Sequence, residues 1–290
     1  MSWIIFLILV INVSLFSQVS DDKYSVFDGT GKASSLDAIA RRAGDMDVVF
    51  LGEFHDDSVG HALQLEIFKR VFENYGKERK VSLSLEMFER DVQVVLDEYL
   101  NGLIPEKQFL ASSRPWGNYE TDYRPLVELA KGNKLNVVAA NAPRRYVNMV
   151  SRLGRQSLEK LSPEAVNWLA PLPFPKSSAK YTEKFNALMG GHGSENIMDS
   201  QTLWDATMAN SIARELKSSD KSLVVHLNGA FHTESRLGTV EQLLNYSPKT
   251  RAMVVTVMYA NDFKNFDKAK HTGIGDFVIL TDPTQPRSKR

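Results

Sequence analysis

Short hydrophobic runs alternate with longer amphipathic segments along most of this chain. The short runs are rich in Val and Leu, which is typical of strands buried on both faces of a parallel sheet. Six runs predict strands, over residues 48–51, 81–87, 135–140, 223–227, 253–258 and 277–280.

The segments between these runs have the hydrophobic spacing of helices. Leu63, Ile67 and Val71 recur at intervals of four residues and predict a helix over residues 58–75. Two further helices are predicted over residues 91–100 and 123–130. Strands that alternate with helices of this length predict right-handed βαβ units. The expected fold class is therefore α/β, with a mainly parallel central sheet flanked by helices.

Residues 143–216 interrupt this alternation, because their hydrophobic pattern predicts helices and no strand. We interpret the segment as a helical insertion or lid between the third and fourth strands of a single domain, residues 19–290. The polar residues 20–35 are expected to wrap the outside of that domain. The polar, basic tail after Pro283 is expected to be disordered.

Residues 1–18 form a separate segment, in which positions 3–13 are almost wholly apolar. The apolar run is too short for an ordinary membrane span and is typical of the core of a secretory signal peptide. We therefore expect an exported protein that is periplasmic or associated with the bacterial envelope. An uncleaved signal acting as a weak membrane anchor is the alternative. The chain has no Cys, so it is not expected to be a lipoprotein.

The amino-acid composition limits which partners and metal sites this chain can have. The 290 residues hold 35 basic and 35 acidic side chains, so the formal net charge is zero. A nucleic-acid partner is not expected, because such partners require a basic face. The absence of Cys excludes disulfides, iron–sulfur clusters and thiolate zinc sites. Any bound metal must be held by His, Asp, Glu or Tyr.

Four polar side chains stand where predicted strands end. Glu53 and His55 follow the first strand, Glu86 ends the second, and His232 follows the fourth. In parallel sheets, ligands bind beyond the carboxyl ends of the strands, so we expect these four residues to meet there. Two imidazoles and two carboxylates suit a divalent transition metal. Helix capping or pairing with Arg is the alternative role for each glutamate.

Several of these residues lie in motifs that resemble those of the ChaN-like haem-binding family. The resemblance runs from about residue 47 to about residue 259 and rests on five motifs in the family's order. They are Leu51-Gly52-Glu53-Phe54-His55-Asp56-Asp57 with His61 and Gln64, Leu85-Glu86-Met87-Phe88-Glu89-Arg90 with Gln93, Asn141-Ala142-Pro143-Arg144, Gln201 with Asp205, Met208 and Ala209, and Gly229-Ala230-Phe231-His232.

The resemblance implies haem binding in bacterial iron uptake, with a tyrosine as axial ligand and haems stacked across a dimer. It therefore implies haem, a second copy of the chain and an envelope haem receptor as partners. The wider group includes Tiki, TraB and erythromycin-esterase-like proteins. Similarity to Tiki implies instead a metal-dependent hydrolase, in which Glu53 or Glu86 would transfer a proton as the metal activates water. A scaffold that retains an unused pocket is a third interpretation.

The haem-binding residues cannot be assigned from the motifs alone. A phenolate ligates ferric haem in catalase, and Arg recognises carboxylates such as the haem propionates. The candidate ligands are Tyr119, Tyr123, Tyr146 and Tyr181, and Arg144 and Arg145 are the candidate propionate partners. His61 follows His55 by six residues and is expected to approach the same site. Packing of a tyrosine ring in the core is the alternative for each tyrosine.

The remaining polar candidates have weaker expectations. Gln201 and Asp205 are one helical turn apart and share a helix face. They could hydrogen-bond a ligating histidine or lie on a helix surface. His226 lies within an apolar run and is expected in the core, whereas His192 and His271 are expected in exposed loops.

Overall fold

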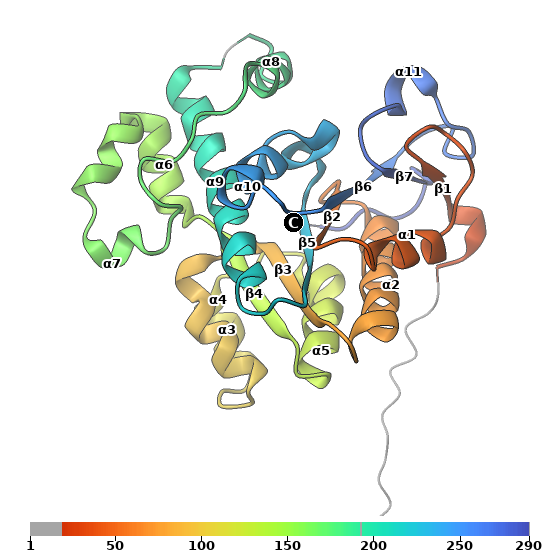
Figure 1. Cartoon of the computed structure of the whole chain (residues 1–290), viewed down its shortest axis with the longest axis horizontal. Coiled ribbons are helices and arrows are strands. Elements are labelled where there is room, and N and C mark those ends of the chain that lie inside the picture. Colours follow the sequence, from red (N-terminus) through yellow and green to blue (C-terminus); the bar gives the residue numbers. More distant parts are fainter. Residues whose placement is uncertain (1–18, 192, 290) are drawn as a thin grey trace, which may run out of the picture.

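A single sheet organises the computed structural model, which describes residues 19–191 and 193–289. The predicted signal peptide and His192 lie outside the described residues. Seven strands are present in the described part of the chain, in the order β1-β7-β6-β2-β5-β3-β4 (Figure 1). Five of the six neighbouring pairs are parallel, and only β1 with β7 is antiparallel. The predicted α/β class with a mainly parallel sheet is confirmed.

The six predicted strands are all present; five are one to three residues longer than predicted, and β4 has the predicted length but is shifted by one residue. They are β2 (Val48–Glu53), β3 (Lys80–Glu89), β4 (Asn136–Asn141), β5 (Ser222–Gly229), β6 (Ala252–Tyr259) and β7 (Phe277–Thr281). Strand β1 (Tyr24–Asp28) lies in the segment that was expected to wrap the outside. Its five residues have a weak hydrophobic pattern, and pairing with β7 at the sheet edge supplies its backbone partners.

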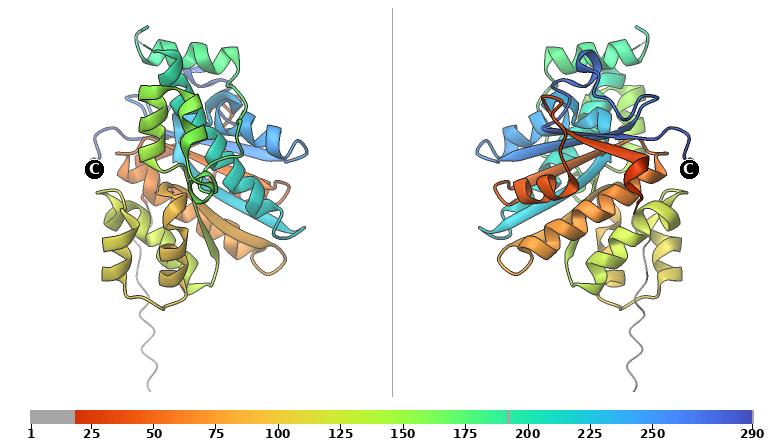
Figure 2. Two further views of the ribbon diagram at one scale, coloured as in Figure 1. Left: turned by 90° about the vertical axis from the view of Figure 1, so that its left-hand side faces the viewer. Right: turned by 90° about the vertical axis from the view of Figure 1, so that its right-hand side faces the viewer.

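Alternate residues of β2 bury their side chains in two different cores. Val49 and Leu51 pack with the larger core, which includes residues of α1, α2 and α5. Val48 and Phe50 pack on the opposite face with residues of α9 and α10. This is the two-residue period of a strand that is buried on both faces. Figure 2 shows helices both above and below the strands.

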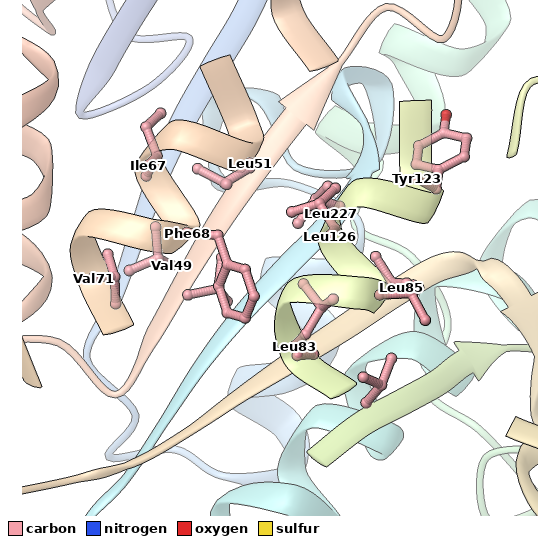
Figure 3. Close-up of a cluster of buried hydrophobic side chains, with 14 of the residues drawn as sticks. Val49, Leu51, Ile67, Phe68, Val71, Leu83, Leu85, Tyr123, Leu126 and Leu227 are labelled. Atoms are coloured by element: carbon pink, nitrogen blue, oxygen red, sulfur yellow. The ribbon is translucent and has the colours of Figure 1, made fainter. Parts of the chain in front are cut away.

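The helices on the first face come mainly from the N-terminal half of the chain. They are α1 (Leu36–Ala43), α2 (Ser58–Tyr75), α3 (Gln93–Leu100), α4 (Glu106–Ser113) and α5 (Arg124–Gly132). Helix α2 begins where the Asp57 side chain accepts a hydrogen bond from Gly60 N, and it ends before Gly76. Figure 3 shows Ile67, Phe68 and Val71 of this helix against side chains of the sheet.

The predicted helical insertion contains no strand in its described residues. Its longer helices are α6 (Arg144–Leu153), α8 (Ala179–Leu188) and α9 (Glu195–Leu216), with short turns at α7 (Pro163–Val166) and η4 (Arg155–Lys160). Helix α9 packs directly on the sheet beside α10 (Thr239–Tyr246). Because Ala209 and Ile212 are fully buried there, α9 is part of the domain core, while α6 and α8 lie farther from the strands (Figure 1).

The expectation of a disordered tail is wrong. Residues after Pro283 return to the main domain, where Ser288 N donates a 3.0 Å hydrogen bond to Asp56 O. Arg287 also forms an antiparallel bridge with Asp57. Polar composition alone suggested disorder, but backbone hydrogen bonds to a distant turn fix the segment. None of the helices in residues 19–191 and 193–289 is both long and apolar enough to cross a membrane.

Candidate functional site

The structure brings Glu53, His55, Glu86 and His232 to one edge of the sheet. Strand β5 lies between β2 and β3, so the C-terminal ends of these three strands are neighbours. Glu53 ends β2, Glu86 lies near the end of β3, and His232 ends the short helical turn η5 (Ala230–His232) that follows β5. The predicted juxtaposition is therefore present, and the chemical role of the four residues stays a prediction.

Glu53 is the centre of one buried group of polar side chains, which we call the Glu53 network: Glu53, His55, His61, Asp122 and Tyr123. Its carboxylate accepts a 2.6 Å hydrogen bond from the Tyr123 hydroxyl and a 2.9 Å hydrogen bond from the Gln64 amide. The Nδ1 atom of His55 lies 2.8 Å from Glu53 Oε1. Burial alone would raise the pKa of Glu53, but His61 and His55 together hold that pKa well below its usual value.

His61 lies between two carboxylates in the same network. Its Nδ1 is 3.4 Å from Glu53 Oε2, and its Nε2 is 3.4 Å from Asp122 Oδ2. Burial would lower the pKa of His61, but the two carboxylates outweigh it and raise the pKa to about 9. His61 is therefore a buried imidazolium at neutral pH, and its charge compensates the buried carboxylates.

A second histidine–carboxylate pair lies across the strand ends. His232 Nδ1 is 2.7 Å from Asp205 Oδ1 and 3.2 Å from the Gln201 amide. Its Nε2 is 3.8 Å from Glu86 Oε1. Burial lowers the pKa of His232, but Asp205 and Glu86 dominate and raise it to about 9. Asp205 and Gln201 were expected either to hydrogen-bond a site histidine or to lie on a helix surface. The structure shows the first, because both side chains contact His232.

Gly229 allows the two halves of the site to approach each other. Its backbone N–H donates a 2.6 Å hydrogen bond to Glu86 Oε2. A Cβ atom at this position would lie only 2.7 Å from His55 Nε2 and 3.7 Å from Glu86 Oε2. Only glycine leaves the space in which both side chains can lie against the end of β5.

These residues border a pocket of about 210 Å³. Trp116 packs edge-on against His55 with ring centroids 4.9 Å apart, and Trp204 packs edge-on against His232 at 6.4 Å. Each histidine is thus held by a carboxylate on Nδ1 and by a tryptophan. The lining consists of His55, Glu86, Glu89, Trp116, Asn141, Ala142, Arg144, Trp204 and His232. Such a pocket can exchange protons with a small polar ligand.

The expected divalent metal does not fit this arrangement. No group of three or more His, Asp or Glu side chains in the described residues is placed to hold a metal ion. The reason is visible in the hydrogen bonds. Glu53 is occupied by Tyr123, Gln64 and His55, and Glu86 by Gly229 N. His55 and His232 hold Glu53 and Asp205 on their Nδ1 atoms. Of the four predicted ligands, Glu53 therefore lies outside the pocket lining that contains His55, Glu86 and His232.

Three of the four candidate haem tyrosines are in the core. Tyr119, Tyr123 and Tyr181 are at most 3% exposed, as in the alternative expectation of a ring packed in the core. A haem contact of Tyr119 or Tyr123 stays a prediction. Burial also raises the pKa of Tyr119 and Tyr123 far above the ordinary value, which disfavours the phenolate. Only Tyr146, on α6, is partly exposed. His61 is 2% exposed and lies beside Glu53 and the His55 backbone, so it approaches the same site as expected, and its role towards haem stays a prediction.

The two arginines before Tyr146 differ in their surroundings. Arg144 is exposed and lines the pocket. Arg145 pairs with Asp91 at 2.5 Å, and its guanidinium carbon lies 4.5 Å from the centre of the Tyr146 ring. Of these three residues at the start of α6, only Arg144 lines the pocket.

Two other histidines also have defined positions. His226 is fully buried in β5 and its Nδ1 is 2.8 Å from Ser84 Oγ, as expected for a core residue. Burial lowers its pKa to about 3. His271 was expected to be exposed but is 4% exposed, because it packs edge-on against Phe266 with ring centroids 5.4 Å apart.

Sequence reasoning missed several residues of the site. Asp122, Asn118, Trp116 and Trp204 lie in helices or turns with no motif of their own, and Ser288 lies in the tail. The only available signal was the position of Trp116, Tyr119 and Tyr123 close together between two predicted helices. Tyr123 contacts Glu53 of β2 from the π-helical turn before α5, and sequence spacing does not show where this turn lies on the sheet.

The fold and pocket define an α/β protein with a polar, histidine-lined site at the C-terminal ends of parallel strands. The sequence model of one family, described as haem-binding uptake, Tiki superfamily, ChaN, matches residues 39–243. The chain belongs to this family. No curated protein matches the sequence.

Solved structures show the same fold. ChaN of Campylobacter jejuni, whose structure is described as showing cofacial haem binding, has a TM-score of 0.68 and 18% identity, covering 90% of this chain and 98% of that chain. A protein from Bacillus cereus has a TM-score of 0.52 and 11% identity, covering 93% and 97%. The type III effector HopBA1 has a TM-score of 0.50 and 11% identity, covering 85% and 93%. At these identities the likeness concerns the fold alone.

Proposed function

We propose that this protein binds ferric haem and acts in haem or iron acquisition. The observation that carries the proposal is the family match over residues 39–243. The fold likeness to ChaN of Campylobacter jejuni, described with cofacial haem, is consistent with it. Haem bound to this chain would supply a ferric centre that a tyrosine can ligate.

The haem site we propose is the surface at the start of α6. The pocket of about 210 Å³ is smaller than the roughly 300–1,000 Å³ typical of small-molecule sites, so haem would lie outside it. Tyr146 is the one candidate tyrosine with an exposed part. Arg144 is exposed nearby and would suit a propionate carboxylate, and Arg145, which pairs with Asp91, would have to exchange that partner to do the same.

Absorption titration with hemin tests this assignment. Tyr146→Phe should abolish the defined Soret shift that the unmodified protein gives at stoichiometric hemin. Tyr259→Phe is the matched control, because Tyr259 is also partly exposed and lies under Arg287 at 3.5 Å. An unchanged Soret shift in Tyr146→Phe would refute Tyr146 as ligand, and no shift in the unmodified protein would refute haem binding.

We also propose that the protein is exported to the periplasm or envelope, as the apolar segment within residues 1–18 indicates. A second copy of the chain and an envelope haem receptor are its proposed partners. Cell fractionation and the hemin-dependent change in sedimentation of the purified protein test these points separately. Cytoplasmic recovery would contradict export, and a monomer at saturating hemin would contradict the dimer.

A metal-independent hydrolase is the second candidate function. The observation that favours it is the pair of histidines, each with a carboxylate on Nδ1 at 2.8 or 2.7 Å. In ester hydrolysis, His55 would take the proton of water as its oxygen bonds to the acyl carbon. His232, protonated because its pKa is about 9, would give a proton to the leaving oxygen as the carbon–oxygen bond breaks.

An activated aryl ester is the probe for this second function. Hydrolysis should persist in EDTA and should fall by about 100-fold or more in His55→Ala, as expected for the loss of a general base. His271→Ala is the control, since His271 lies outside the pocket lining. If His55→Ala and the unmodified protein hydrolyse the ester equally, the pocket is not a hydrolase site for esters.

A further inference from the structure

The segment 283–289, which we call the strap, folds back over the turn that carries His55. Ser58 Oγ donates a 2.6 Å hydrogen bond to Pro286 O. Arg287 pairs with Asp57 in an antiparallel bridge. Ser288 N donates a 3.0 Å hydrogen bond to Asp56 O. The turn between β2 and α2 is therefore held by hydrogen bonds to residues more than 200 positions away in the sequence.

The strap also packs on the aromatic residues beside this turn. The guanidinium carbon of Arg287 lies 3.5 Å from the centre of the Tyr259 ring. Tyr259 in turn packs edge-on against Phe54, with ring centroids 4.8 Å apart. Phe54 directly precedes His55, so this stack holds the backbone on the side away from the pocket. Cation–π contacts of this kind stabilise by about 0.5–1 kcal/mol at exposed sites.

A continuous path of polar contacts leads from the strap to His55. Ser288 Oγ donates a 3.0 Å hydrogen bond to Asp122 Oδ1. The other oxygen of Asp122 accepts a 2.6 Å hydrogen bond from the Asn118 amide and lies 3.4 Å from His61 Nε2. The Asn118 amide also lies 3.2 Å from His55 O. His61 Nδ1 lies 3.4 Å from Glu53 Oε2, and Glu53 Oε1 lies 2.8 Å from His55 Nδ1. The path of contacts therefore ends at the His55 imidazole.

We propose that Ser288 is a positioning residue for the pocket and that the strap sets the orientation of His55. By bonding Asp122 Oδ1, the Ser288 hydroxyl fixes the plane of that carboxylate and keeps Oδ2 directed at Asn118 and His61. Such supporting hydrogen bonds determine the ring orientation of the histidine they serve, and members of a buried network strengthen one another. The strap is thus part of the functional site although it lines none of the pocket. This inference is independent of haem binding at Tyr146.

The test compares Ser288→Ala with Ser288→Thr in the full chain. In Ser288→Ala, amide hydrogen exchange of residues 55–61 should rise about fivefold, the factor that corresponds to one lost hydrogen bond of typical strength. The ring-nitrogen NMR signals of His55 and His61 should move in the same variant. Ser288→Thr retains the hydroxyl and should restore both measurements.

Matched controls separate positioning from general loosening. Ser219→Ala changes a serine in the loop before β5, at the opposite edge of the sheet, and should leave both measurements unchanged. The His226 and His271 ring signals report on the rest of the fold and should not move in any variant. The proposal is overturned if Ser288→Ala leaves His55 and His61 unchanged. It is also overturned if Ser288→Thr has the same effect as Ser288→Ala, because the hydroxyl would then not be the operative contact.

Discussion

The Tyr123 hydroxyl donates a 2.6 Å hydrogen bond to the Glu53 carboxylate, joining residues 70 positions apart in the sequence. Both side chains are nearly inaccessible to solvent, at 0% and 2% exposure. Tyr123 therefore supplies a hydrogen-bond donor to the buried carboxylate. A phenylalanine at this core position would leave the carboxylate without that donor.

Tyr123→Phe should lower the free energy of unfolding by about 1.5–3 kcal/mol, the usual worth of a hydrogen bond to a charged group. Urea denaturation measures this loss. Tyr75→Phe is the control, because the Tyr75 hydroxyl bonds the backbone oxygen of Arg41 at an exposed position. It should cost about 1 kcal/mol or less. An equal decrease in the free energy of unfolding in the two variants would show that the charge on Glu53 does not strengthen its hydrogen bond with Tyr123.

Stability should fall at alkaline pH because of His61 and His232. The pKa of each is raised from 6.5 to about 9 in the folded protein. Their contribution is therefore complete below pH 6.5 and is lost as the pH rises through about 9. We expect a decrease of about 3 kcal/mol for each group in urea denaturation across this range, since each pH unit between the two pKa values corresponds to about 1.4 kcal/mol.

Two variants check the origin of this pH dependence. His61→Gln should remove part of the alkaline slope, since one titrating imidazole is gone. His226→Gln should leave the slope unchanged, because the pKa of His226 is lowered to about 3 and this group is neutral above pH 7 in both states. A slope that is identical in His61→Gln and the unmodified protein would contradict a buried His61 imidazolium.

Gly229→Ala should displace His55 and close the pocket. The added methyl would lie 2.7 Å from His55 Nε2, so either the imidazole or the end of β5 must move. We expect a loss of about 1–3 kcal/mol, typical of overpacking, together with a shift of the His55 ring signal in NMR. Gly132→Ala meets no atom within 4 Å at the end of α5 and should be neutral or slightly stabilising. Retention of the His55 signal in Gly229→Ala would be inconsistent with the described geometry.

Arg90 should be essential for holding the insertion on the sheet. Its buried guanidinium donates to neutral oxygens of the described residues, and burial lowers its pKa to about 9. It donates hydrogen bonds to Leu169 O at 2.7 Å and to Ser211 Oγ at 2.6 Å, which joins the end of β3 to the insertion and to α9.

Arg90→Lys should lower stability by about 2–4 kcal/mol, because a single ammonium cannot reproduce the planar set of donors. Limited proteolysis should then cleave residues 154–178 faster than in the unmodified protein. Arg42→Lys is the control at an exposed ion pair with Asp45, where the change should be within about 0.5 kcal/mol. Equal cleavage rates in the two variants would argue against this role for Arg90.

The sequence by itself determined the strands β2 to β7, the α/β class and the meeting of Glu53, His55, Glu86 and His232. These follow from local patterns: hydrophobic runs specify buried strands, and residues at the carboxyl ends of neighbouring parallel strands share one edge. The order of the strands and the edge strand β1 did not follow, because β1 has little hydrophobic signal and depends on its partner β7.

The tertiary structure alone decided which atoms the site residues contact. Tyr123 was predicted as a candidate haem ligand. In the structure it is the last residue of the π-helical turn η3 (Tyr119–Tyr123) before α5, and its hydroxyl donates to Glu53 at the end of β2. Of the predicted metal ligands, Glu53 is held behind His55 and outside the pocket lining, while Asp205 of α9, which was not among them, holds Nδ1 of His232. The strap was expected to be disordered, yet Ser288 reaches Asp122. Sequence spacing carries no information on such long-range contacts, since they depend on how helices and returning segments pack on the completed sheet.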